Sequence, residues 1–219
     1  TILFIKEVIM NIKSSNYIKR ILVCLIANIL IGITIAAMRV VNLGIDPFTS
    51  LIIGVSNLSK IPFRYIYPII NAVIIILIFF LNKPMIGIGT VINLLVIGPV
   101  ADYSAALIEN IYNKQTFISR IIILIIALII MSMNVSIYTS TNIGVSAYDS
   151  LFITINKKKP KISLGIARII TDSISMIVGI IGKATLGIGT LLNVFLMGPM
   201  VEFFNKNVTN KLLKNIMDD

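Results

Sequence analysis

Histidine is missing from this 219-residue chain, and cysteine occurs once, as Cys24. A single cysteine cannot form an intramolecular disulfide, and histidine is both the commonest general base and the commonest metal ligand. No cysteine cluster is left to hold a metal either. These absences argue against an enzyme and predict no catalytic residue, no metal site and no cofactor. Cys24 itself is expected to be a small buried hydrophobic side chain.

Charge is also scarce. Charged residues make up 13% of the chain and hydrophobic residues 57%, and the mean hydropathy is +1.00. An ordinary soluble domain has roughly 25% charged residues, so the composition predicts an integral membrane protein. The net charge of +10 could suggest nucleic acid, but the lysines and arginines punctuate apolar segments and form no basic stripe. No nucleic-acid partner is therefore expected.

Several apolar stretches are long enough to span a bilayer. A hydrocarbon core of ~30 Å takes about 20 residues at 1.5 Å per residue. One stretch is interrupted by Asp172, whose carboxylate would have to face protein or water. Six long helices are predicted, over 21–38, 65–82, 84–101, 121–148, 169–182 and 184–201.

Residues 42–100 recur 100 positions later without a gap. The identities fall on Gly, Thr, Asn and Pro, which fix backbone geometry, while the apolar positions between them vary. The pattern predicts an all-α, polytopic helical membrane protein of two 100-residue repeats, each with three long helices and one short broken helix. The expected divisions are a basic cytoplasmic segment 1–19 with Met10 as a candidate native start, membrane repeats 20–113 and 114–205, and a cytoplasmic C-terminal tail 206–219.

A helix-breaking motif follows the first long helix of each repeat. Asn and Gly tolerate the left-handed conformation just past a helix end, and Asp or Ser then caps a new helix, with Pro47 at its first position in one copy. The new helix, about 46–58 or 146–156, would be ~18 Å long, which is short of a full crossing. It could be half-membrane, tilted or re-entrant. The two copies read Asn42-Leu43-Gly44-Ile45-Asp46 and Asn142-Ile143-Gly144-Val145-Ser146.

A second motif, Gly-x-Gly-Thr-x-x-Asn followed by Gly-Pro, opens the last long helix of each repeat. The glycines predict close packing and the asparagines a hydrogen bond to another helix, worth ~0.6 to 2 kcal/mol in a membrane. The glycines do not form a phosphate-binding loop, because the required lysine is absent. The predicted helix-break and packing residues are Pro47, Gly87, Gly89, Thr90, Asn93, Gly98, Pro99, Gly187, Gly189, Thr190, Asn193, Gly198 and Pro199.

Paired helix breaks in duplicated membrane proteins often expose helix N-termini to a substrate, although any helical turn in lipid needs such caps. The second copy also carries Asp149 and Asp172 where the first has Thr49 and Ala72. An acidic group inside an apolar segment is costly and often marks a proton, ion or substrate site, and Arg39 and Arg168 are available counter-ions. The predicted substrate-binding residues are Asn42, Gly44, Asp46, Asn142, Gly144, Asp149 and Asp172.

The orientation of the copies depends on whether the short helices cross the membrane. If they cross, the loop with Lys60 and Arg64, the loop with Lys114 and Arg120, the 157–161 cluster and both termini share one side. Only Lys83, Lys183 and Arg39 then lie opposite. This positive-inside pattern favours parallel copies, with both termini in the cytoplasm of a bacterium and the chain in its plasma membrane.

These motifs together resemble the YczE/YyaS/YitT-type family of bacterial membrane proteins, and the similarity runs through nearly the whole chain. The Gly-Thr-x-x-Asn and Gly-Pro segments are its most specific part, while Ala147 replaces the proline that stands at Pro47 in the first copy. The resemblance implies a multi-pass bacterial plasma-membrane protein of poorly defined activity. It supplies no catalytic residues.

Two functions remain open at this stage. One is transporter-like binding or translocation of a small solute at the repeat interface. The other is a non-transporting accessory, scaffold or sensor whose basic loop contacts anionic lipid or protein. That loop contains Lys157, Lys158, Lys159 and Lys161.

Overall fold

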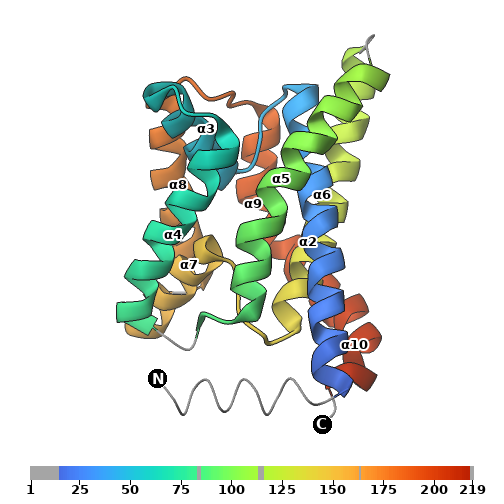
Figure 1. The fold of residues 1–219 in the computed structure, drawn as a ribbon, viewed down its shortest axis with the longest axis vertical. Coiled ribbons are helices and arrows are strands. Elements are labelled where there is room, and N and C mark those ends of the chain that lie inside the picture. Colours follow the sequence, from blue (N-terminus) through green and yellow to red (C-terminus); the bar gives the residue numbers. More distant parts are fainter. Residues whose placement is uncertain (1–14, 83–84, 113–115, 163, 218–219) are drawn as a thin grey trace.

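A computed structural model describes residues 15–82, 85–112, 116–162 and 164–217, and these residues form helices and connecting turns without a β-strand (Figure 1). The prediction of an all-α fold with three long helices and one short helix in each half is confirmed. The first half contains α2 (Ser15–Val41), α3 (Pro47–Ser59), α4 (Phe63–Asn82) and α5 (Ile88–Ile111). The second contains α6 (Phe117–Ser140), α7 (Ala147–Lys158), α8 (Leu164–Ile181) and α9 (Ile188–Phe204), followed by a π-helical turn (Asn205–Thr209) and α10 (Asn210–Met217).

The protein is a polytopic membrane protein. Five helices are long and apolar enough to span a bilayer, namely Asn16–Val41, Phe63–Leu81, Ile88–Ile111, Phe117–Ser140 and Ile188–Lys214. The sixth expected segment forms α8, which contains Arg168 and Asp172 and is not among the five. Large apolar side chains cover the outside of the helices, while asparagines such as Asn28 and Asn71 are buried. This distribution suits a bundle surrounded by lipid.

The two halves run in opposite directions. In Figure 1, α2 rises from the lower end to the upper end and α6 descends beside it. Arg120, near the start of α6, donates from Nη2 to the carbonyl oxygen of Asn42 at 2.9 Å, just past the end of α2. The upper side is the end of the bundle at which α2 stops and α6 begins. The lower side is the opposite end. The prediction of parallel copies is wrong.

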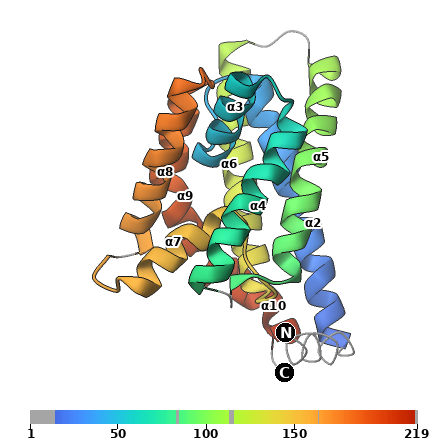
Figure 2. The same ribbon diagram turned by 60° about the vertical axis from the view of Figure 1, so that its left-hand side comes forward.

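The short helices do not cross the bundle. After α2 the chain turns back into the interior, where α3 begins among buried residues, and α3 then ends on the upper side (Figure 2). In the second half, α7 likewise begins inside and ends on the lower side. At 1.5 Å per residue, 13 and 12 residues are about 18–20 Å long, too short for a hydrocarbon core of ~30 Å. Both are re-entrant helices, and this is why the halves are inverted.

The helices form two groups, each drawn from both halves. Helices α2, α5, α6 and α9 pack against one another, and so do α3, α4, α7 and α8. We call these the first and second helix groups. Figure 1 shows the second group beside the first, with α4 next to α5, and α9 contacts α3 and α8 of the second group. The candidate functional site lies where the groups meet.

Each helix break is held by the glycine motif of the opposite half. The N–H of Gly89 donates to the carbonyl of Ile143, and the N–H of Gly189 donates to the carbonyl of Leu43, both at 2.8 Å. The hydroxyl of Thr90 donates to the carbonyl of Val145 at 2.6 Å. The backbone of the re-entrant turns is therefore satisfied inside the membrane, as a bilayer requires.

Thr190→Val is expected to lower the free energy of unfolding by about 1–2 kcal/mol, because the buried N–H of Ile45 loses the hydroxyl oxygen that accepts from it at 3.1 Å. Thermal unfolding of the purified protein in detergent measures this. The matched control is Thr34→Val, since the Thr34 hydroxyl bonds only the carbonyl of Ile31 in its own helix. Equal losses in both variants would contradict the prediction.

Candidate functional site

A small cavity of about 70 Å³ lies between the two helix groups. Every helix from α2 to α9 contributes at least one side chain to its wall. At the ~30 Å³ that a water occupies in the liquid, the cavity holds about two waters or a ligand of a few atoms. Its position among eight helices makes it sensitive to any movement of one group against the other.

Both re-entrant helices begin at this cavity. Asp46 caps α3 by accepting from the N–H of Thr49 at 2.9 Å, and Ser146 caps α7 by accepting from the N–H of Asp149 at 3.0 Å. The two capping residues line the cavity. A helix N-terminus has a partial positive charge of about +0.5, so two such ends approach the site from opposite halves of the chain.

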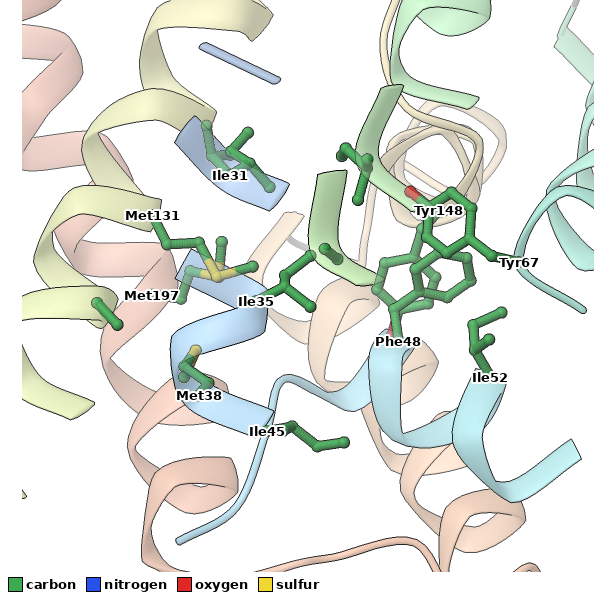
Figure 3. Close-up of a cluster of buried hydrophobic side chains, with 14 of the residues drawn as sticks. Ile31, Ile35, Met38, Ile45, Phe48, Ile52, Tyr67, Met131, Tyr148 and Met197 are labelled. Carbon is green, nitrogen blue, oxygen red and sulfur yellow. The ribbon is translucent and has the colours of Figure 1, made fainter. Parts of the chain in front are cut away.

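Aromatic rings form one wall. Phe48 and Tyr148, which are equivalent in the two halves, stack with ring centroids 4.6 Å apart and an interplanar angle of 22°. Tyr67 packs its ring against the edge of Phe48 at 5.9 Å. Figure 3 shows Phe48, Tyr67 and Tyr148 together, facing Ile35 and the methionines Met131 and Met197 across the core.

Two carboxylates of the site are held by tyrosines. The hydroxyl of Tyr138 donates to Asp149, and the hydroxyl of Tyr148 donates to Asp172 at 2.6 Å. Arg168, one turn before Asp172 on α8, places its Nε 3.7 Å from the second oxygen of that carboxylate. The three aspartates Asp46, Asp149 and Asp172 all line the cavity and are buried.

Four polar atoms of the wall have no hydrogen-bond partner among the described residues. These are Oδ2 of Asp46, Oγ1 of Thr49, Nε of Arg168 and Nδ2 of Asn193. By contrast, Asn93, the counterpart of Asn193, donates to Oδ1 of Asn28 at 2.7 Å, the bond to another helix that the sequence predicts. Buried polar groups are nearly always paired, so an acceptor and a donor without partners at a cavity indicate room for a ligand or water.

The structure separates the predicted binding residues into two sets. Asp46, Asp149 and Asp172 come together at the cavity, whereas the Asn and Gly residues of the two turns do not line it. Those turn residues adopt positive φ angles, and the turn glycines contact the glycine motif of the opposite half. Their place is in the turns, not in the site. The residues concerned are Asn42, Gly44, Asn142 and Gly144.

Among the predicted packing glycines, Gly98 and Gly198 differ. A Cβ on Gly98 would contact the ring of Tyr67 at 3.4 Å, whereas a Cβ on Gly198 would meet nothing within 4 Å. The equivalence of the two motifs therefore extends to the glycines before the threonine and not to the later pair.

Sequence reasoning missed part of the wall. It took Arg168 only as an available counter-ion, and it did not single out Tyr67 or Tyr138 as site residues. Isolated aromatic residues in an apolar helix are indistinguishable from ordinary core side chains. The one available signal was the aromatic pair Phe48 and Tyr148 at equivalent positions directly after the helix breaks.

Different features lie on the two sides of the cavity. On the lower side, a larger cavity of about 600 Å³ shares Val135, Asp149 and Arg168 with the central one and reaches the exposed Glu202 and Lys206. We call it the vestibule. On the upper side, Arg39 of α2 pairs with Asp102 of α5 at 2.7 Å and lies 4.6 Å above the ring of Phe63 on α4. That contact joins the two helix groups on the upper side.

The lysine cluster lies away from this site, at the lower end of α7 and in the turn after it. Lys158 and Lys159 are exposed and border an apolar groove of about 830 Å³ between α4 and α8. The expected basic segment lies largely in residues 1–14, outside the described residues, as do Lys83 and Lys114. The expected C-terminal tail is helical over Asn210–Met217, and Leu213 there is buried.

Comparison with known proteins gives the relationship of the chain. A family model described as "Family of unknown function (DUF6198)" matches residues 18–206. The Bacillus subtilis (strain 168) protein named "Uncharacterized protein YyaS" is 24% identical over 163 residues, which cover 74% of this chain and 81% of that protein. No solved structure matches. The chain belongs to the DUF6198 family, and the predicted similarity to YyaS-type proteins is confirmed.

Proposed function

We propose that this member of the DUF6198 family binds a small solute in the central cavity and carries it across the bacterial plasma membrane. The observation that supports the proposal is the meeting of two re-entrant helices, one from each inverted half, with both N-termini at one buried cavity. Inverted repeats with broken helices at the midplane are a recurring architecture of secondary transporters. In this proposal the second helix group moves against the first and exposes the cavity to each side in turn.

The distribution of positive charge supports an orientation with the lower side in the cytoplasm. Among the described residues, five basic residues lie at the upper ends of their helices, namely Arg39, Lys60, Arg64, Arg120 and Lys183. The lower ends carry more positive charge, which is typical of cytoplasmic segments. Their basic residues are Lys19, Arg20, Lys157, Lys158, Lys159, Lys161, Lys206, Lys211 and Lys214. The described ends of the chain are both cytoplasmic in this orientation, and the vestibule faces inward.

Cysteine labelling in a Cys24→Ala background tests whether the cavity changes sides. Val135 borders both the cavity and the vestibule, and Ile35 lies on the cavity wall in the oppositely oriented α2. Val135→Cys is expected to react with a membrane-impermeant maleimide from the cytoplasmic side, and Ile35→Cys only slowly from the outside. Adding Phe63→Ala removes the ring beneath Arg39 and is expected to raise outside labelling of Ile35→Cys several-fold.

Ile126→Cys is the matched control, because Ile126 lies on the same helix as Val135 but faces outward, where lipid excludes the reagent. Alternating access would be refuted if Val135→Cys and Ile35→Cys were both labelled from the same side only, with or without Phe63→Ala. Such a result would favour the accessory reading, in which the buried polar groups only lock the helices together.

A further inference from the structure

The wall of the central cavity has an excess of negative charge. Three carboxylates line it, from Asp46, Asp149 and Asp172, and Arg168 is the one basic side chain in its lining. With these groups ionised the formal sum is −2. The two helix N-termini offset about one unit of this at roughly +0.5 each, so the wall remains negative. A positively charged ligand is the complement of such a wall.

One carboxylate oxygen is free to receive that ligand. Asp149 and Asp172 each accept a hydrogen bond from a tyrosine hydroxyl. Asp46 uses Oδ1 to cap α3, and its Oδ2 has no partner among the described residues although the side chain is only 6% exposed. The hydroxyl oxygen of Thr49, one turn along and also lining the cavity, has no described partner either. Both atoms can accept from an N–H donor.

The surroundings favour an organic cation over a metal ion. Among the residues that the structure describes, no group of three or more Asp, Glu or Cys side chains is placed to hold a metal. The cavity is bounded instead by the rings of Phe48, Tyr67 and Tyr148. The faces of such rings attract alkylated ammonium groups, which a desolvated site binds through ring and carboxylate together. The volume of about 70 Å³ limits the occupant to a compact molecule.

We propose that the central cavity binds a compact ammonium-type cation, whose N–H groups donate to Oδ2 of Asp46 and whose carbon atoms lie against the aromatic wall. This inference rests on the proposed function and names the class of solute. Nδ2 of Asn193, an unpartnered donor of the same wall, then faces the uncharged end of the ligand and can donate to a hydroxyl there. Methylammonium and ethanolamine are therefore the probes, the second carrying such a hydroxyl.

The test is titration of the purified, detergent-solubilised protein with methylammonium chloride or ethanolamine hydrochloride, followed by calorimetry and thermal unfolding. Sodium chloride, potassium chloride and sodium formate at the same ionic strength are run in parallel. Saturable binding of at least one amine is expected, with an apparent Kd at least tenfold weaker in Asp46→Asn and several-fold weaker in Phe48→Leu. Glu109→Gln, which neutralises an exposed carboxylate at the end of α5, is expected to bind like the parent protein.

Equal stabilisation by sodium or potassium would assign an alkali-ion site and overturn the proposal, and so would stabilisation by formate alone. Binding of neither amine, or amine binding unchanged in Asp46→Asn, would overturn it too. If Asp46→Asn does not fold, Phe48→Leu decides, because the ring can be removed without touching the helix cap. Should amine binding fail while cysteine labelling shows access from both sides, the transport proposal stands and only the class of solute is wrong.

Discussion

Gly144→Ala is expected to destabilise the protein by about 3 kcal/mol, one of the largest effects of any single methyl group in this chain. Gly144 has a φ of +112°, which costs an L-residue roughly 1–2 kcal/mol. The added Cβ would also lie within 2.8 Å of Cα and 2.6 Å of N of Gly87, and backbone atoms cannot rotate away. Forcing an extra carbon into such a contact costs about 1–3 kcal/mol more. The melting temperature of the purified protein in detergent measures the loss.

Gly198→Ala provides the control for that experiment. Gly198 lies inside α9, and a Cβ there would meet nothing within 4 Å. Alanine in a helix interior is better than glycine by roughly 0.5–1 kcal/mol, so this variant should be as stable as the parent or slightly more so. If Gly144→Ala matched Gly198→Ala, the contact between the turn of one half and the glycine motif of the other would not be tight.

Arg168→Met is expected to lower the free energy of unfolding by a similar amount, about 3 kcal/mol, for an electrostatic reason. The Asp172 carboxylate would keep its hydrogen bond from Tyr148 but lose its cationic neighbour, in a cavity that already holds two other aspartates. Removing one partner of a buried ion pair typically costs 3–5 kcal/mol, because the remaining charge is uncompensated. Arg168 also stacks its guanidinium over the ring of Phe152 at 5.3 Å, which methionine would only partly replace.

A double-mutant cycle separates the charge from the packing. Asp172→Asn keeps the shape of the side chain, so Arg168→Met should cost considerably less in that background than in the parent. A coupling free energy of about 1–3 kcal/mol is expected for groups in direct contact. Additive effects of the two substitutions would mean that Arg168 acts through packing on Phe152 alone. The cycle is read from thermal unfolding in detergent and needs no knowledge of the solute.

The local elements of the fold could be predicted because their causes are local. Asp46 and Ser146 were expected to cap new helices, and each does so by accepting an N–H three residues further on. The inverted orientation could not be predicted in this way. It depends on contacts such as that between Arg120 and Asn42, which are 78 residues apart. The charge argument assumed that Lys60 and Arg64 share a side with the termini, but a re-entrant α3 keeps them on the upper side.

The candidate site was predictable only where the two halves differ. Asp149 and Asp172 stand out against Thr49 and Ala72 in the first half, and the structure brings both aspartates to the cavity. The turn residues could not be assigned from sequence, because an asparagine or glycine past a helix end suits either a ligand or a neighbouring backbone. In this fold the neighbouring backbone is that of Gly87 or Gly187.

The hydrogen bonds between the two halves also decide when each re-entrant turn can be completed during synthesis. The backbone N–H of Ile45 has as its partner the hydroxyl of Thr190, 145 residues later. At 5–20 residues per second, a ribosome needs about 7–30 s to make the intervening chain. Throughout that interval the N–H of Ile45 lacks the partner that it has in the complete fold, and an unpaired backbone donor is costly among lipid tails. The first re-entrant turn is therefore completed only after α9 has been made.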